Sequence, residues 1–375
     1  MPGNEEKIQG ARNIVEAFFS RDDLVGVGIE LLGKGHINDS FLLSIGGGGR
    51  AGQYVLQKIN HQVFDEPEGI MANLRTLAEH FHRYGGDRNA GGLETIRLLS
   101  TIDGKDYVVD REGNYWRIIN YIKDAVNCER ISSPEQAREV GRALGLFHRI
   151  TSNLVPASLV DTLPGFHVTP VYLAQYDRLM ENPAREVSSS AERYCLEIIS
   201  GRRGLVDVLE EAARKNFIRC QVIHGDPKLD NILFDQQTGK AVALIDLDTV
   251  KPGLLHYDIG DCLRSSCNSA GASGFVQEVD FDLGACREVL QGYSREMAPL
   301  LTEKDLEYIF PAVRLITFEL GLRFFSDYIT GDVYFKTTRP GQNLHRAMVQ
   351  FKLLESVEAQ EDEIREIVLR GMGRG

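Results

Sequence analysis

Hydrophobic and polar positions over the first 125 residues alternate in the way that predicts β-strands. The predicted strands cover residues 29–45, 54–59, 107–110 and 115–122. Four consecutive glycines at 46–49 separate the first two strands and predict the turn of a hairpin. Residues 71–84 carry apolar side chains at three- and four-residue steps, which predicts one helix. The N-terminal part of the chain is therefore expected to be a small β-rich lobe.

From residue 132 the periodicity becomes helical. Ser133 is predicted to cap a helix that begins at Pro134 and runs to about Arg149, and Gln136 has the spacing of a capping box. Further helices are predicted at approximately 170–180, 189–215, 283–296, 303–329 and 344–370, and one β-rich interruption at 222–250. The predicted fold class is α+β, with a β-rich N-terminal lobe over residues 1–125 and a helical C-terminal lobe over residues 126–375 that carries a β-hairpin. The joint is expected near 122–127.

Composition and charge exclude some classes of function. The formal net charge is −12, and 26% of residues are charged and 43% hydrophobic. A surplus of acid argues against nucleic-acid partners and against binding to an anionic membrane surface. No apolar run approaches the roughly 20 residues that cross a bilayer, and the start of the sequence is not that of a signal peptide. The six cysteines show no paired spacing and are expected to be reduced thiols. A cytoplasmic location is expected.

Candidate chemistry is concentrated in residues 224–248, where H-G-D-P-K-L-D-N-I-L-F-D is followed by a turn and by A-V-A-L-I-D-L-D. If the two apolar segments pair around the turn, Asn231 and Asp246 lie within about one residue of register at the open end of the hairpin. Asp226 lies in the loop just before it. Two carboxylates and one amide are therefore expected to converge.

This set of side chains suits phosphoryl transfer, in which catalysis is mostly positioning and electrostatic stabilisation. Asp246 and Asn231 are predicted to bind Mg²⁺, which prefers oxygen ligands. Asp226 is predicted to accept a hydrogen bond from the attacking hydroxyl and then its proton. Lys228 is expected to reach the transferring phosphate. The alternative is a solvated polar loop that precedes a hairpin.

The H-x-D-x-K-x-x-N pattern with a following strand-borne Asp resembles the catalytic core of protein-kinase-like folds, and most closely the aminoglycoside and choline kinases. Within that branch the chain resembles the N-acetylhexosamine 1-kinases over residues 25–355. The segments that carry this resemblance are G-K-G-H-I-N (33–38), Y-V-L-Q-K-I-N (54–60), I-D-L-D-T-V-K-P-G (245–253), D-I-G-D-C-L-R (258–264) and E-L-G-L-R-F-F-S-D-Y-I-T-G-D-V-Y-F (319–335). The resemblance implies a bilobal kinase-like fold. It also implies transfer of phosphate from ATP, with Mg²⁺, to the anomeric hydroxyl of N-acetylglucosamine or N-acetylgalactosamine.

The nucleotide site is expected in the N-terminal lobe. The loop of Gly33, Lys34 and Gly35 has the composition of a phosphate-covering loop, although a plain hairpin turn would look similar. Kinase-like folds offer a strand lysine to the phosphates, but here Gln57 stands at that position and Lys58 one place later. Strand alternation puts these two side chains on opposite faces, so either one is a candidate. The resemblance places adenine against Tyr121 and Ile122, and Glu79 is a possible partner for the lysine.

The acceptor is expected to be a small molecule, an amino sugar by the resemblance, which points to Arg323 and Tyr334 as its contacts. His36, which follows the glycine loop, and Asp226 are the other residues expected to contact it. An ion pair of Arg323 with Glu319 or Asp327 is the structural alternative. Asp248 shares a strand face with Asp246 by alternation and is a further possible metal ligand. His224 and Asp258 are expected to brace the catalytic loop.

Three functions remain to be compared. The first is an N-acetylhexosamine kinase. The second is a kinase of another small alcohol, such as a different sugar, an aminoglycoside or an amino alcohol. The third is a nucleotide-binding scaffold without activity, against which the intact Asp226, Asn231 and Asp246 argue. A protein kinase is disfavoured because no D-F-G or A-P-E segment follows.

Overall fold

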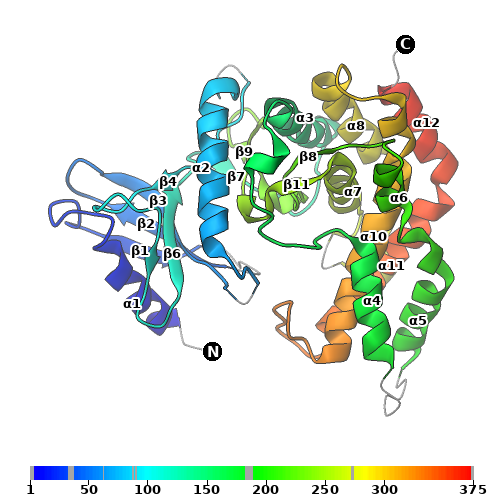
Figure 1. Cartoon of the computed structure of the whole chain (residues 1–375), viewed down its shortest axis with the longest axis horizontal. Coiled ribbons are helices and arrows are strands. Elements are labelled where there is room, and N and C mark those ends of the chain that lie inside the picture. Colours follow the sequence, from blue (N-terminus) through cyan, green and yellow to red (C-terminus); the bar gives the residue numbers. More distant parts are fainter. Residues whose placement is uncertain are drawn as a thin grey trace.

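The computed structural model of the chain describes residues 4–32, 38–61, 63–86, 88, 91–181, 189–271 and 274–372. Figure 1 shows a β-rich N-terminal lobe on one side and a larger helical lobe on the other, with helix α2 between the N-terminal sheet and the larger lobe. The predicted α+β, protein-kinase-like bilobal fold is confirmed. No described helix has the length and apolar character needed to cross a bilayer.

The N-terminal lobe is built on an antiparallel sheet with strand order β1-β2-β3-β6-β4, to which β5 adds by pairing with β6. Its elements are α1 (Asn4–Val15), β1 (Gly28–Leu31), β2 (Asp39–Ile45), β3 (Gly52–Lys58), α2 (Pro67–Tyr84), β4 (Leu98–Leu99), β5 (Val108–Val109) and β6 (Tyr115–Asn120). The predicted strand over 29–45 is divided into β1 and β2. The predicted helix 71–84 is confirmed and begins four residues earlier, at Pro67.

The two faces of this sheet have different neighbours. Leu56 and Trp116 belong to a buried cluster with α1, whereas Val55 and Ile119 belong to the main core, together with residues of α2 and the larger lobe. Since side chains alternate along a strand, Gln57 of β3 faces the larger lobe. The next residue, Lys58, faces the α1 side.

The larger lobe is mainly helical. Its helices are α3 (Pro134–Thr151), α4 (Thr169–Met180), α5 (Ser190–Arg202), α6 (Val208–Arg214), α7 (Leu255–Ser266), α8 (Leu283–Met297), α9 (Glu303–Glu307), α10 (Ile309–Thr330), α11 (Gln342–Ala359) and α12 (Glu361–Met372). The predicted cap of α3 is present, since the Ser133 side chain accepts a hydrogen bond from the backbone N–H of Gln136. Helices α3 and α8 lie so close that a Cβ on Gly292 would come within 1.9 Å of the Arg138 carbonyl oxygen, so glycine is required there.

Several predicted helix boundaries differ from those observed. The expected helix 189–215 is divided into α5 and α6, the helix 303–329 is divided at Tyr308, and the helix 344–370 is divided at Gln360. Helix α7 was not predicted. Almost all of its residues are buried, including Asp258 and Asp261 on its polar side, although apolar residues recur at helical spacing in its sequence (Leu255, Ile259, Cys262 and Leu263).

Five short strands support the candidate site. They are β7 (Ala125–Val126), β8 (Cys220–Ile223), β9 (Ile232–Asp235), β10 (Ala241–Leu244) and β11 (Lys251–Leu254). The predicted hairpin is β9–β10, whose open end is closed by a hydrogen bond from the Ile245 N–H to the Asn231 carbonyl oxygen at 2.9 Å. Strand β7 pairs with β9, and β8 pairs with β11. The loop at 224–231 therefore lies between two anchored strands.

Candidate active site

Asp258 of α7 holds the loop that carries Asp226 through two hydrogen bonds to its backbone. The two oxygens of this carboxylate accept hydrogen bonds from the backbone N–H groups of His224 at 2.7 Å and Gly225 at 2.8 Å. Burial alone would raise the pKa of Asp258, but the hydrogen bond and charge of His148, and the bond from His224, lower it. Gly225 has φ +85°, and a Cβ there would lie 2.6 Å from the Thr249 carbonyl oxygen. Both features fix the backbone just before Asp226.

The Asp226 carboxylate has two polar partners, Lys228 and Asn231. It forms an ion pair with Lys228, and the Asn231 side-chain Nδ2 donates to the Asp226 carbonyl oxygen at 2.8 Å and to Oδ2 at 3.1 Å. Burial would raise the pKa of Asp226, but the Lys228 ammonium outweighs burial and holds the pKa below its usual value. The carboxylate is therefore ionised at neutral pH and able to accept a proton.

Asp246 follows β10 and has left-handed backbone angles, φ 62° and ψ 54°. Among the described residues no Lys, Arg or His pairs with it. Surrounding protein atoms and the charge of Asp248 raise its pKa to about 6, although the residue remains open to solvent. Asn231 lies across the open end of the hairpin from Ile245, the residue before Asp246, and its Nδ2 donates to Asp226. Within the residue ranges that the structure describes, neither the Asp246 carboxylate nor the Asn231 side-chain oxygen accepts a hydrogen bond.

These two groups fit a small, hard cation. Mg²⁺ is commonly held by one or two protein oxygens together with substrate phosphates and water. In the described part of the chain there is no cluster of three or more His, Cys, Asp or Glu side chains that could hold a metal without a substrate. Asn231 and Asp246 offer the one or two protein oxygens that such an ion takes.

Asp248 is held by protein donors. The backbone turns at Asp246 into a short 3₁₀-helix, Leu247–Thr249, so the strand alternation expected for Asp246 and Asp248 does not apply. One oxygen of Asp248 accepts from Arg117 at 2.6 Å and the other from Asn38 at 2.8 Å. Because both oxygens have protein partners, Asp248 joins the two lobes and we do not assign it to the metal.

The choice between Gln57 and Lys58 follows from the register of β3 and β6. Gln57 lies opposite Arg117 and accepts two hydrogen bonds from its guanidinium, at 3.0 and 2.8 Å. Lys58 lies opposite Trp116 on the other face, with its Nζ 5.9 Å from the centre of the indole ring. Gln57 therefore faces the candidate site and Lys58 faces away from it.

The structure describes only some of the other residues that are predicted to bind the nucleotide. Gly33, Lys34 and Gly35, and with them His36, lie outside the described residues. Asn38, which follows them, is buried and contacts Asp248. Tyr121 and Ile122 lie between β6 and β7, where the chain passes from one lobe to the other, and Ile122 is buried in the main core.

Arg323 of α10 is surrounded by aromatic rings. The four rings around its guanidinium carbon, at 4.9 to 5.7 Å, are those of Phe166, Tyr172, Tyr334 and Phe335. Within the described chain neither Glu319 nor Asp327 forms an ion pair with Arg323, so the structural alternative is not observed. Asp327 instead accepts hydrogen bonds from the backbone N–H groups of residues 333–335 and fixes the turn that carries Tyr334.

Sequence reasoning missed two residues at this site, Arg117 and His167. His167 has φ 65° and lies in a loop before α4, with its Nε2 2.7 Å from the Gly225 carbonyl oxygen. No local pattern marks either residue, since each meets its partners through contacts between distant parts of the chain.

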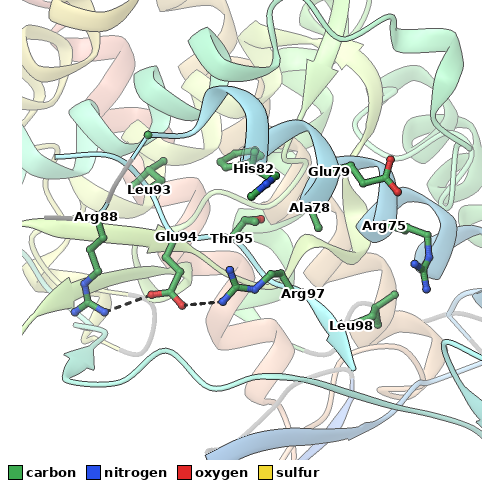
Figure 2. Close-up of a pocket in the computed structure, with 12 residues that line it drawn as sticks. Arg75, Ala78, Glu79, His82, Arg88, Leu93, Glu94, Thr95, Arg97 and Leu98 are labelled. Atoms are coloured by element: carbon green, nitrogen blue, oxygen red, sulfur yellow. Dashed lines mark hydrogen bonds and ion pairs between the residues drawn. The ribbon is translucent and has the colours of Figure 1, made fainter. Parts of the chain in front are cut away.

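A separate pocket of about 550 Å³ lies beside α2 (Figure 2). Figure 2 shows Glu94 between Arg88 and Arg97, at N–O distances of 3.4 and 3.8 Å. Glu79, the possible lysine partner, lines this pocket. Of the predicted catalytic, metal and acceptor residues that the structure describes, none lines this pocket, so it is distinct from the part of the candidate site described above.

Comparisons with known proteins identify a family for this chain and structures with a similar fold. The model of the family described as "Phosphotransferase enzyme family" matches residues 28–293. Among solved structures the chain is similar to a microcompartment-associated aminopropanol kinase, with 16% identity, a TM-score of 0.63 and coverage of 95% of this chain and 98% of that one. It is also similar to an aminoglycoside phosphotransferase from Alicyclobacillus acidocaldarius (14% identity, TM-score 0.61, coverage of 96% of each chain). A choline kinase from Cryptosporidium parvum matches at 13% identity, with a TM-score of 0.58 and coverage of 98% of each chain.

Proposed function

Because the chain belongs to the phosphotransferase enzyme family, we propose that it transfers the γ-phosphate of ATP to the anomeric hydroxyl of an N-acetylhexosamine. Membership of this family shows that the chain is a small-molecule phosphotransferase. The metal, the residue roles and the acceptor are the proposed parts.

Asp226 is the proposed base. Its carboxylate accepts the hydrogen bond of the acceptor hydroxyl, which orients an oxygen lone pair towards the γ-phosphorus. As the new O–P bond forms and the bond from the γ-phosphorus to the β-phosphate oxygen breaks, the hydroxyl proton passes to Asp226 and ADP leaves. Lys228, paired with Asp226, places a positive charge beside the transferring phosphate.

Asn231 and Asp246 are the proposed ligands of Mg²⁺. When bound, the ion would neutralise negative charge on the phosphates. Asp246 has no cationic partner among the described residues, which supports this role, because a carboxyl whose pKa is about 6 gains from a nearby cation.

The observation that carries the choice of acceptor is the ring of four aromatic side chains around Arg323. A ring of aromatic faces is the usual binding site for a cationic ammonium group. Here the protein's own guanidinium occupies it, so a positively charged acceptor would meet a like charge. A neutral acceptor with hydroxyl and carbonyl groups can instead accept hydrogen bonds from Arg323 and pack on the rings.

An N-acetylhexosamine has these groups. The sequence resemblance over residues 319–335, which includes Arg323 and Tyr334, supports this acceptor in particular. A kinase of an amine-bearing alcohol is the alternative, since the structural neighbours include aminopropanol and choline kinases.

A direct test is to incubate the purified protein with Mg-ATP and single acceptors, and to follow ADP formation and the phosphorus NMR spectrum of the product. The acceptors are N-acetylglucosamine, N-acetylgalactosamine, glucose, galactose, kanamycin, choline and homoserine. We expect a sugar 1-phosphate, formed fastest from an N-acetylhexosamine. Preferential phosphorylation of kanamycin or choline would contradict the proposed acceptor, although the protein would still be a small-molecule kinase.

A further inference from the structure

Arg117 places a buried guanidinium at the junction of the two lobes. The residue lies on β6 directly across from Gln57 of β3, and its Nη2 reaches Asp248 of the larger lobe at 2.6 Å. It is 2% exposed. The side chain is therefore fixed from both lobes and has little freedom to move.

Protein partners use only part of this guanidinium. Nε and Nη2 donate to the Gln57 side-chain oxygen, and Nη2 also donates to Asp248. Nη1 is buried and has no hydrogen-bond acceptor among the residues that the structure describes. An unpaired buried donor on a charged group is unfavourable, so the position favours a ligand that brings an acceptor.

The surroundings of Arg117 indicate which hydrogen-bond acceptor the ligand supplies to Nη1. Asp248, the ion-pair partner of Arg117, is two residues from the proposed metal ligand Asp246. The guanidinium therefore lies near the place where the metal-bound phosphates are expected, and phosphate oxygens match its geometry.

We propose that Nη1 of Arg117 donates hydrogen bonds to non-bridging oxygens of the α- or β-phosphate of the nucleotide, and so takes the role that a strand lysine has in kinase-like folds. This inference rests on the proposed function, because it needs a nucleotide in that site. Gln57, at the usual lysine position, orients Arg117. Lys58 does not compete, because it faces Trp116 on the other side of the sheet.

The test measures binding of ATP, ADP and adenosine by calorimetry in the absence of any acceptor. In Arg117→Met we expect affinity for Mg-ATP and for ADP to fall by about 10- to 100-fold, as for loss of a charge-assisted hydrogen bond. Affinity for adenosine should stay within about twofold, because adenosine has no phosphate. Lys58→Met is the matched control and should bind all three ligands as the wild type does.

The variant R117M leaves Asp248 buried without its cation, which can impair folding. The double variant R117M/D248N carries no unpaired charge at this place, and we expect the same selective loss. An equal loss for adenosine would show that Arg117 only supports the fold, and unchanged affinity for ATP and ADP would also overturn the inference. A wild-type protein that bound no Mg-ATP would overturn the proposed function itself, which separates the two failures.

Discussion

The carboxylate of Glu319 lies 3.0 Å from Nδ1 of His167, deep in the larger lobe. The other ring nitrogen, Nε2, lies 2.7 Å from the carbonyl oxygen of Gly225. Both partners are acceptors, so both ring nitrogens must carry a proton and His167 is an imidazolium. A buried cation thus ties α10 to the backbone next to Asp226.

This ion pair predicts a pH-dependent contribution to stability. Burial would lower the pKa of His167, but the Glu319 charge and hydrogen bond outweigh burial and raise it above 6.5. The pKa of Glu319 is lowered by His167, against burial. His167 therefore stabilises the fold fully below pH 6.5, and this contribution is lost as pH rises through its folded pKa. The contribution of Glu319 to stability is lost as the pH falls through the folded pKa of Glu319.

We expect His167→Gln to reduce the free energy of unfolding by roughly 3–5 kcal/mol near pH 6, as for removal of one partner of a buried ion pair. The difference between wild type and variant should shrink towards pH 9. Urea unfolding at pH 6, 7.5 and 9 measures it. A difference that is the same at all three values would mean that His167 is neutral in the folded protein.

A second prediction concerns Asp226. Asp226→Asn preserves the shape of the side chain but cannot take a proton, so we expect kcat to fall by about 10²–10⁴-fold. The dissociation constant for Mg-ATP should change by less than about threefold, because we propose that Asp226 contacts the acceptor and not the nucleotide. Steady-state kinetics and calorimetry on the same preparation measure both. Equal losses in turnover and ATP affinity would contradict the role of base.

The sequence predicts the closeness of Asn231 and Asp246 because the contact is local. Asn231 and Asp246 meet through one hairpin, and a five-residue turn between two apolar segments is enough to place them together. The prediction fails two residues later, at Asp248. The left-handed backbone at Asp246 ends the strand, and strand alternation says nothing about a 3₁₀ turn.

Residues that act through long-range contacts are harder to predict. Arg117 meets Gln57 across strands that are sixty residues apart in sequence and Asp248 across the lobe junction. Its role depends on the register of β3 and β6, which the strand pattern does not specify. His167 lies in a loop with a left-handed backbone and no periodicity. Helix α7 is a different case, because its apolar residues recur at helical spacing (Leu255, Ile259, Cys262 and Leu263), so the sequence does hold a local signal for this helix.

A third prediction tests the metal. Asp246→Asn should weaken binding of Mg-ATP by about 100-fold, because even residues that only support metal ligands contribute roughly 10–100-fold. Titration of the nucleotide at several Mg²⁺ concentrations measures the loss.

The same titration in excess EDTA provides the control, because no metal is then shared between Asp246 and the phosphates. Wild type and D246N should bind metal-free ATP with similar affinity. A loss of equal size with and without Mg²⁺ would assign Asp246 to direct contact with the nucleotide or to the fold.

The fourth prediction separates acceptor binding from nucleotide binding. Arg323→Met removes the guanidinium but retains apolar contact with the four rings, so the aromatic cluster should stay packed. We expect KM for the sugar to rise by about 10- to 100-fold, while the affinity for Mg-ATP stays the same. Arg346→Met is the matched control, since Arg346 also lies over an aromatic ring, that of Phe324 at 5.6 Å, and is not assigned to the site. If Arg323→Met left the sugar KM unchanged, or raised the affinity for the sugar, the aromatic cluster would not be the acceptor site.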